Sequence, residues 1–498
     1  MVGASIQAKL DGQGRLYQQI YRAIKGDILS GHLGHGEKLP SIRTLSADFG
    51  VSKSVVQAAL ECLTADELIH SVHGSGIFVT YNLQTKKQPL KKNAPEQDAS
   101  VAGKPAPAIS NFSKAMEDEN PHLIFLQRLR DPKPQYNLEY GTPVASAALR
   151  TKWSKAMTLA ARLDGEKYAE AAGEISLRTE IARYICKSRG IGCNPEDIII
   201  CNGAQQAFDL VSRCLYTDQA SVAFEDPGYF NARRTFHANG YKIIPVPVDE
   251  SGMQIERLLD LSNPNIRLAC VTPSHQMPLG SVLSLDRRQM LLAWAARNET
   301  VIMEDDYDGE FRFGSRYIPS LKSMDEHDNV IYIGTFSKTI FPSLRLGYII
   351  APERFRTHLL NAKTVSDLGT SALLQKAAAI FIHTGGFAQN LAATRKAYAQ
   401  CRNALITSLK QSGRNLKIVD GAAGLHVSVL FPEPISDRIV PLTNALLSRS
   451  VSLHDPRDYF FEKEACNMLI FGCTQIDKTD AAESVGLIAE EMARHQLC

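Results

Sequence analysis

The sequence lacks the cysteine spacing that metal-binding and disulfide-stapled domains need. Its ten cysteines are scattered over 498 residues, and no two of them form a C-x-x-C pair. Such pairs are typical of structural zinc sites, and dense, regular cysteines are typical of small secreted domains. The scattered pattern speaks against both classes and favours reduced thiols in a cytoplasmic protein without a bound metal.

Long apolar runs and net charge are also missing. No stretch approaches the roughly 18 apolar residues of a membrane span, and the first nine residues lack the layout of a signal peptide. Lysine and arginine number 55 and aspartate and glutamate 53, so the formal net charge is +2. This balance argues against bulk electrostatic binding to nucleic acid, but it is compatible with a small DNA-binding module on a larger neutral body. We expect a soluble, intracellular protein with no membrane partner.

The composition, 44% hydrophobic and 22% charged, is that of a globular protein, and the length predicts about two to four domains. Residues 82–120 are rich in lysine and proline and poor in large apolar residues near their start. We interpret them as a flexible linker between residues 1–81 and residues 121–498. The lysines of the linker suit either a solvated tether or a basic arm that also contacts phosphate.

The segment before the linker carries the pattern of three helices and a hairpin. Apolar residues recur every four positions over residues 16–28, and a glycine follows shortly after. Ser41 and Ser52 are positioned to cap a second and a third helix. Residues 69–72 and 77–80 read as two short strands around a glycine-rich turn. This order predicts a winged helix.

A DNA-binding winged helix needs short polar and basic side chains where its third helix begins, and glycines that let the wing approach the duplex. Residues 39–46 (LPSIRTLS), 51–56 (VSKSVV) and 74–79 (GSGIFV) meet this need and resemble the GntR-type winged helix-turn-helix. The residues that we therefore predict to contact DNA are Arg43, Ser52, Lys53, Ser54, Gly74 and Ser75.

Two observations temper this interpretation. Lys53 stands where the GntR family more often has arginine, so a point charge replaces a bidentate fork. Acidic and basic residues roughly cancel over residues 1–80, so a basic face would have to come from their arrangement. The alternative is a winged helix that contacts protein, with Arg43 as a solvated charge.

From about residue 136 onward, apolar segments alternate with helix-like stretches, which is typical of βα units around a mostly parallel sheet. Polar clusters follow four of the candidate strands directly. Because open α/β sheets bind ligands at the carboxyl ends of their strands, these clusters are the expected location of the chemistry. The candidate strands are residues 198–200, 221–224, 268–271, 300–303 and 330–333.

Three of the clusters suit a phosphate-bearing aldehyde cofactor. Residues 334–347 (GTFSKTIFPSLRLG) contain Lys338 and Arg345, a carbonyl-binding amine beside an anion site. Residues 304–308 (EDDYD) offer a carboxylate to a ring nitrogen and a phenol to a ring oxygen. Residues 202–207 (NGAQQA) open a helix, where free backbone N–H groups favour phosphate. The acids of the second cluster would also suit Mg²⁺.

Together these segments resemble fold-type I pyridoxal-phosphate enzymes of the aspartate aminotransferase group over residues 121–498. The resemblance implies a large α/β domain with a smaller C-terminal α/β subdomain. It also implies that Lys338 forms a Schiff base with pyridoxal 5'-phosphate, that Asp305 pairs with the ring nitrogen, and that Tyr307 donates to a ring oxygen. The other cofactor contacts that it implies are Gly203, Ala204, Gln205, Thr335, Ser337 and Arg345 at the phosphate, Tyr229 at the ring face, and Tyr168 from the partner subunit of a homodimer.

A winged helix, a linker and an aminotransferase-like body in this order resemble the MocR-type regulators, a GntR subfamily. Residues 272–280 (TPSHQMPLG) agree with that subfamily. Such regulators resemble aminotransferases that have kept the cofactor and use it as a sensor, so that the binding of an amine alters the geometry of the DNA-binding heads.

Several positions depart from the aminotransferase pattern. Met277 stands where those enzymes usually have an asparagine that hydrogen-bonds to the cofactor, and residues 466–472 contain no arginine for a substrate α-carboxylate. Asn231 replaces an arginine of the best-known aminobutyrate-sensing member, which speaks against aminobutyrate as effector. Candidate effector contacts are Arg233 with its neighbour Arg234, Arg457, which also suits a surface loop, and His275, which also suits a structural hydrogen bond.

The sequence therefore predicts a dimeric, cytoplasmic, pyridoxal-phosphate-dependent transcription regulator. It would bind a double-stranded DNA operator and sense an amine or amino acid through an aldimine at Lys338. Two alternatives stay open: an active aminotransferase with an appended DNA-binding domain, and a cofactor reservoir or dimerisation scaffold with no small-molecule response. Met277 and the missing arginine weigh against efficient turnover, and so against an enzyme.

Overall fold

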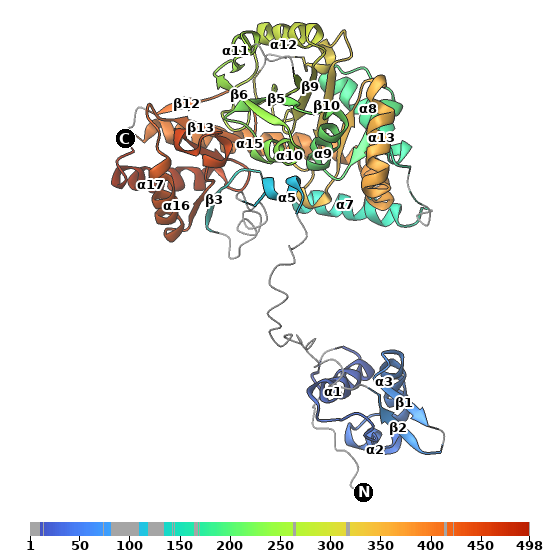
Figure 1. Cartoon of the computed structure of the whole chain (residues 1–498). Helices are drawn as coiled ribbons and strands as arrows, with labels where there is room; N and C mark the ends of the chain where they lie inside the picture. The colour runs from blue at the N-terminus through green and yellow to red at the C-terminus, as the bar shows by residue number, and fades with distance from the viewer. Residues whose placement is uncertain are drawn as a thin grey trace, which may run out of the picture. The chain divides into compact units, whose positions relative to one another are not determined.

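The computed structural model divides into two compact units, Met1–Ala108 and Ile109–Cys498 (Figure 1). The predicted linker lies outside the described residues except at residues 109–117, where a short helix, α5 (Asn111–Ala115), begins after Ser110. The structure describes residues 10–12, 14–72, 74–80, 109–117, 134–141, 143, 145–163, 168, 170–261, 265–314, 319–412, 416–421 and 423–497.

The first unit has the predicted order of three helices and a hairpin. These are α1 (Leu16–Ser30), α2 (Ile42–Asp48), α3 (Lys53–Ala65), β1 (Ile69–Val72) and β2 (Gly76–Val79). The two strands pair antiparallel, with Ile69 opposite Val79. The apolar stripe of α1 packs against α3, and the buried core includes Ile20, Ile24, Val56 and Leu63.

The second unit is built on an eight-stranded sheet in the order β4-β11-β10-β9-β8-β5-β6-β7. Neighbouring strands are parallel, except that β11 runs antiparallel to β10 and β4, and β7 runs antiparallel to β6. All five strands that the sequence predicts for this unit are present. The strands are β4 (Ile198–Cys201), β5 (Ser221–Asp226), β6 (Lys242–Asp249), β7 (Gly252–Met253), β8 (Ile266–Val271), β9 (Val301–Asp306), β10 (Val330–Thr335) and β11 (Gly347–Ile350).

Helices cover the sheet on both sides, with α11 and α12 on one side and α9 and α10 on the other (Figure 1). Strands β9 and β10 are buried along their whole length, as expected for a sheet covered on both faces. The helices in this part of the chain are α7 (Ala147–Ala160), α8 (Ile175–Arg189), α9 (Ala204–Leu215), α10 (Phe230–Ala238), α11 (Ile255–Leu259), α12 (Leu285–Arg297), α13 (Glu353–Asp367) and α14 (Ala372–His383).

A smaller C-terminal part follows the long helix α15 (Gly386–Gln411), as predicted. Its antiparallel sheet has the order β12-β13-β15, and β14 pairs in parallel with β3 from the start of the unit. This last pairing brings residues near 140 and near 454 close to each other. The elements are β3 (Tyr136–Leu138), β12 (Lys417–Val419), β13 (His426–Leu430), α16 (Ser436–Ser448), β14 (Val451–Leu453), β15 (Met468–Gly472) and α17 (Lys478–Arg494).

Five single-turn 3-10 helices connect these elements, at Pro195–Asp197, Lys322–Met324, Pro342–Leu344, Arg457–Tyr459 and Lys463–Ala465. Within the described part of the chain, no helix is both long enough and apolar enough to cross a membrane.

Candidate functional site

A cavity of about 240 Å³ lies at the carboxyl edge of the eight-stranded sheet. The ends of β9 and β10, the beginning of α9, and the segments after β3 and β14 form its wall. The lining residues are Glu139, Tyr140, Gly141, Ala204, Gln205, Phe208, Tyr229, Met277, Asp305, Tyr307, Thr335, Ser337, Lys338, Pro342, Arg345, His454 and Tyr459.

Lys338 enters this cavity three residues after the end of β10. Its Nζ donates a hydrogen bond of 2.7 Å to the carbonyl oxygen of Gly141 and lies 5.0 Å from the centre of the Tyr140 ring. A carbonyl oxygen and an aromatic face both favour an ammonium group. The lysine amine is therefore held at the wall of the cavity.

Asp305, the second-to-last residue of β9, supplies a buried carboxyl group to the cavity. The residue is 4% exposed, and its Oδ1 has no hydrogen-bond partner among the described residues. Burial, and then the nearby charges of Asp306 and Asp308, raise the pKa of Asp305 well above its usual value. A buried carboxyl group in this state is complementary to a cationic N–H donor, which would lower its pKa. The protonated ring nitrogen of pyridoxal phosphate is such a donor, so this residue fits that cofactor.

Tyr307 lies two residues further along, with its hydroxyl group near two side chains. The hydroxyl oxygen is 3.0 Å from His275 Nδ1 and 3.9 Å from Met277 Sδ. Burial, followed by the charge of Asp308, raises the pKa of Tyr307 well above its usual value. The phenol therefore keeps its proton and can donate a hydrogen bond.

The opposite end of the cavity is suited to an anion. Helix α9 begins at Ala204, and the backbone N–H groups of its first turn have no intrahelical acceptors. Because no side chain caps this helix start, these N–H groups can bind an anion. Arg345 donates to the carbonyl oxygen of Asn202 over 3.1 Å, which places its guanidinium beside this helix start. Gly203 has a φ of 80°, and a Cβ there would lie 2.9 Å from Arg345 Nη2. Only glycine allows this close approach of the backbone to the guanidinium group.

The remaining predicted cofactor contacts differ in position. Gln205, Tyr229, Thr335 and Ser337 line the cavity, and the Thr335 and Ser337 hydroxyl oxygens are 3.0 Å apart. Tyr168 is 92% exposed and does not line the cavity of its own chain.

The candidate effector residues lie outside the cavity lining. Arg233 donates to the backbone oxygens of Tyr459 and Asp458, over 3.2 and 2.7 Å, and Arg457 forms an ion pair with Asp455 at 2.6 Å. Arg234 is buried. His275 is also buried and lies behind Tyr307 rather than at the cavity wall.

The structure adds cavity residues that the sequence patterns did not reveal. Glu139, Tyr140 and Gly141 follow β3, whereas His454 and Tyr459 follow β14. More than 300 positions separate the two groups in the sequence, and the parallel pairing of Val451 with Tyr136 unites them. Short-range periodicity carries no signal of this pairing.

The acidic cluster does not form the Mg²⁺ site that its spacing also allowed. Asp305 faces the cavity, whereas Asp306 binds Arg189 at 2.5 Å and the Tyr332 hydroxyl at 2.6 Å. Asp308 lies 3.0 Å from His275 Nδ1. The three carboxylates take different partners and do not converge on one cation.

In the first unit, the predicted DNA-binding residues are exposed at the start of α3, on α2 and at the hairpin turn. Arg43, Ser52, Lys53, Ser54, Gly74 and Ser75 are all exposed. The capping prediction holds for Ser41, whose Oγ accepts the N–H of Thr44 at 3.2 Å. It is wrong for Ser52, whose side chain caps no backbone N–H and instead lies 2.9 Å from the Ser54 hydroxyl oxygen.

The fold and the cavity define a winged helix-turn-helix unit joined to an aminotransferase-type domain. Residues 16–79 match the family of bacterial regulatory proteins of the gntR type, and residues 135–452 match the class I and II aminotransferase family. This chain therefore belongs to the MocR-type family of helix-turn-helix transcriptional regulators, as the sequence predicted.

Two relatives illustrate the match over the whole chain. The probable rhizopine catabolism regulatory protein MocR of Rhizobium meliloti is 31% identical over 476 residues, which cover 94% of this chain and 92% of the relative. The pyridoxine biosynthesis regulator PdxR of Corynebacterium glutamicum is 30% identical over 463 residues, with coverage of 92% and 91%.

Solved aminotransferase structures share the fold of the large unit. The α-aminoadipate aminotransferase LysN of Thermus thermophilus superposes with a TM-score of 0.69 at 24% identity, over 78% of this chain and 98% of LysN. The predicted architecture, a winged helix and a fold-type I α/β domain of the pyridoxal-phosphate class, is confirmed.

Proposed function

We propose that this regulator binds pyridoxal 5'-phosphate in its large unit, senses an amine or amino acid there, and thereby changes how its winged helices bind an operator. The observation that carries the proposal is the convergence on one cavity of the Lys338 amine, the Asp305 carboxyl group, whose Oδ1 has no hydrogen-bond partner among the described residues, and the anion site at the start of α9 and Arg345. When bound, the cofactor supplies an aldehyde that combines covalently with amines.

Each residue at the cavity then has a distinct task. Lys338 would hold the cofactor covalently through its Nζ, and an effector amine would compete with this lysine for the aldehyde, as the sequence predicts. Asp305 keeps the ring nitrogen protonated, and Tyr307 donates to the ring oxygen. The start of α9 and Arg345 bind the phosphate.

The effector would lie against the part of the cavity wall formed by Glu139, Tyr140, His454 and Tyr459, which holds none of the predicted cofactor contacts. A ligand changes DNA binding only by binding one conformation better than the other, and a tenfold shift needs about 1.4 kcal/mol of differential affinity. Release of the Lys338 side chain on effector binding would provide such a difference if only one of the two conformations accommodates the freed lysine.

We also propose that the regulator is a homodimer that acts in the cytoplasm. The exposed Tyr168 suits a contact to the phosphate in the partner subunit, and nine described cysteines are free thiols. A sedimentation mass of about twice the 54.8 kDa chain is expected. Two heads per dimer would then bind paired half-sites.

A second candidate function is transamination by the same cavity. Lys338, Asp305 and Tyr307, the set that this reaction needs, line one cavity. Met277 occupies the place of the expected asparagine and offers only a weak sulfur acceptor. A cofactor band that an amino acid bleaches and a keto acid restores would favour this candidate.

The proposal is tested by the visible absorbance of the purified protein with added pyridoxal phosphate. The wild type and Lys242→Ala, a control at an exposed lysine of the same unit, are expected to show a visible band that survives gel filtration. Lys338→Ala is expected to lose it. A band of equal strength in Lys338→Ala would refute covalent binding at this residue.

A further inference from the structure

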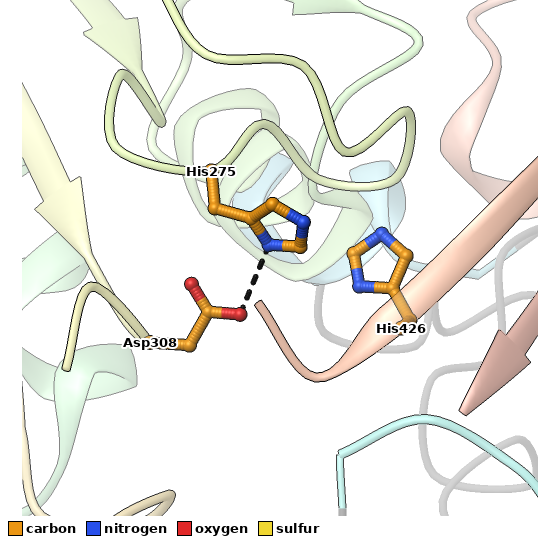
Figure 2. Close-up of side chains that lie close together, drawn as sticks. All are labelled: His275, Asp308 and His426. Atoms are coloured by element: carbon orange, nitrogen blue, oxygen red, sulfur yellow. Dashed lines mark hydrogen bonds and ion pairs between the residues drawn. The ribbon is translucent and has the colours of Figure 1, made fainter. Parts of the chain in front are cut away.

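His275 occupies a buried position directly behind the Tyr307 hydroxyl group. The residue is 2% exposed, and its Nδ1 lies 3.0 Å from the Tyr307 hydroxyl oxygen and 3.0 Å from Asp308 Oδ2. Figure 2 shows the imidazole between the Asp308 carboxylate and the ring of His426. His275 follows β8 and Asp308 follows β9, so two neighbouring strand ends create this contact.

The contact with Asp308 fixes which nitrogen of His275 carries the hydrogen. An ionised carboxylate can only accept, so His275 Nδ1 must be protonated to bond with it. The backbone N–H of Leu425 donates to the same Asp308 oxygen over 3.3 Å and helps to hold it in place. His275 Nδ1–H is therefore a donor that points at both the carboxylate and the phenol oxygen.

A donor at this position decides where the Tyr307 hydroxyl hydrogen can point. The phenol oxygen accepts from His275, so its own hydrogen must turn to another acceptor. Met277 Sδ, 3.9 Å away, is a weak acceptor. The other neighbours are Tyr140, which packs edge-on against the Tyr307 ring, and the cavity that both tyrosines line.

The surrounding backbone packs closely against the His275 ring. A Cβ at Gly424 would lie 1.8 Å from His275 Cε1 and 2.0 Å from its Nδ1, and a Cβ at Gly280 would lie 3.3 Å from its Nε2. Both glycines have positive φ values, 80° and 86°. The two loops therefore pack against the imidazole from two sides and hold the plane of its ring, while the contact with Asp308 selects the nitrogen that faces the carboxylate.

His426 completes the surroundings without competing for Asp308. Its Nε2 donates to the carbonyl oxygen of Pro278 over 2.8 Å, and its ring centre lies 4.6 Å from that of His275. Burial, followed by the proximity of His275, lowers the pKa of His426 well below its usual value. A neutral His426 adds no positive charge beside His275.

We propose that His275, oriented by Asp308, is a positioning residue that turns the Tyr307 hydroxyl hydrogen into the cavity. This inference rests on the proposed function, since the ring oxygen of the cofactor is the acceptor that Tyr307 would meet there. His275 thus acts through Tyr307, at a place where Met277 provides no hydrogen-bond donor.

The first test compares two variants of nearly equal shape. His275→Asn keeps an amide N–H close to the place of Nδ1, whereas His275→Leu removes the donor. The readout is the pH at which the visible band of the bound cofactor changes. A hydrogen bond to the ring oxygen favours its ionised form, so weakening that bond raises the midpoint.

We expect His275→Leu to raise the midpoint by roughly half to one pH unit, in the same direction as Tyr307→Phe. His275→Asn should remain close to the wild type. Equal shifts in the Leu and Asn variants would show a purely structural residue, and no shift in either would show that Tyr307 needs no orientation. Both results would overturn the inference.

A second measurement does not depend on the cofactor or on the folding of a variant. In the cofactor-free full chain labelled with ¹⁵N-histidine, NMR is expected to show the Nδ1–H tautomer for His275. The Nε2–H tautomer would overturn the inference. The candidate ligand atoms of His275, Asp308 and His426 lie within 4.8 Å of one another, so one equivalent of a metal ion bound there would overturn it too. If the wild type shows no visible band, the proposed function is refuted, whereas the tautomer measurement still tests the orientation of His275.

Discussion

At the scale of single residues, the large unit contains several buried carboxyl groups. Asp305, Glu225 and Glu304 are each at most 4% exposed. Glu225 accepts hydrogen bonds from the backbone and the hydroxyl group of Thr272, and Glu304 accepts from two backbone N–H groups, whereas Asp305 Oδ1 has no partner in the described part of the chain. Glu225 and Glu304 are therefore satisfied by hydrogen bonds within the protein, whereas we propose that Asp305 pairs with a ligand.

Asp305→Asn should weaken cofactor binding at least tenfold, because it removes the charge that faces the ring nitrogen; tenfold corresponds to about 1.4 kcal/mol. Equilibrium dialysis against pyridoxal phosphate measures the affinity. Asp286→Asn, at an exposed position in the first turn of α12, is the control. Equal affinities of wild type and Asp305→Asn would contradict the assigned pairing.

Glu225 makes stability depend on pH. Burial raises its pKa from the usual 4.5 to about 7, so between these values the folded state binds a proton that the unfolded state does not. The contribution of Glu225 to the free energy of unfolding therefore rises as pH falls from 8 to 5. Glu225→Gln removes this gain, up to about 3 kcal/mol.

Chemical denaturation at pH 5 and pH 8 measures this effect. Tryptophan fluorescence reports on the large unit alone, because both tryptophans, Trp153 and Trp294, lie in it. The difference between the wild type and Glu225→Gln is expected to depend on pH in the stated direction. A difference that stays constant over this range would contradict the raised pKa.

At the scale of secondary-structure elements, the start of α9 shows how backbone geometry shapes the site. Gly203 combines φ 80° with ψ 172°, a region that essentially only glycine adopts. This conformation brings the helix start against the Arg345 guanidinium.

Gly203→Ala should cost about 1–3 kcal/mol of stability from backbone strain alone. The added methyl group should also displace Arg345 and weaken cofactor binding. Thermal unfolding with and without pyridoxal phosphate separates the two effects. Gly192→Ala is the matched control, since a Cβ there meets no atom within 4 Å; similar losses in both variants would contradict the account.

Elements with a strong local pattern could be predicted from the sequence. The stripe of α1 and the apolar strands β4, β5, β8, β9 and β10 lie where the periodicity indicated. The cap at Ser52 was wrong because a neighbouring hydroxyl group, that of Ser54, engages its side chain instead. A capping pattern predicts the residue type but not the group to which its side chain forms a hydrogen bond.

Part of the candidate site could also be predicted, because motifs after β4, β9 and β10 carry their chemistry in short stretches. The wall formed by Glu139, Tyr140 and His454 could not, since it depends on the pairing of β3 with β14 across most of the chain. Nor could the sequence show that Arg233 and Arg457 bind nearby oxygen atoms of the chain. The hydrogen-bond and ion-pair partners of these arginines depend on which residues lie close to them in the folded chain.

At the scale of the whole molecule, one chain combines a nearly neutral balance of charge with a DNA-binding fold. The net charge of +2 gives no bulk attraction to DNA. We therefore propose that binding depends on a few exposed groups, among them Arg43 and Lys53.

Lys53→Ala should weaken DNA binding and reduce the slope of log K against log salt by about 0.9, as expected for the loss of one phosphate contact. Fluorescence anisotropy at several salt concentrations gives the slope. Lys242→Ala, in the large unit, is the control. An unchanged slope for Lys53→Ala would remove this lysine from the DNA interface.

The central claim is that the covalent chemistry at Lys338 controls DNA binding. The most direct test follows the anisotropy of labelled promoter DNA while amines and amino acids are added to the cofactor-loaded wild type and to Lys338→Ala. We predict that at least one compound changes the DNA affinity of the wild type, and that the same compound leaves Lys338→Ala unaffected. An equal response in both proteins, or no response of the wild type to any compound, would contradict the account.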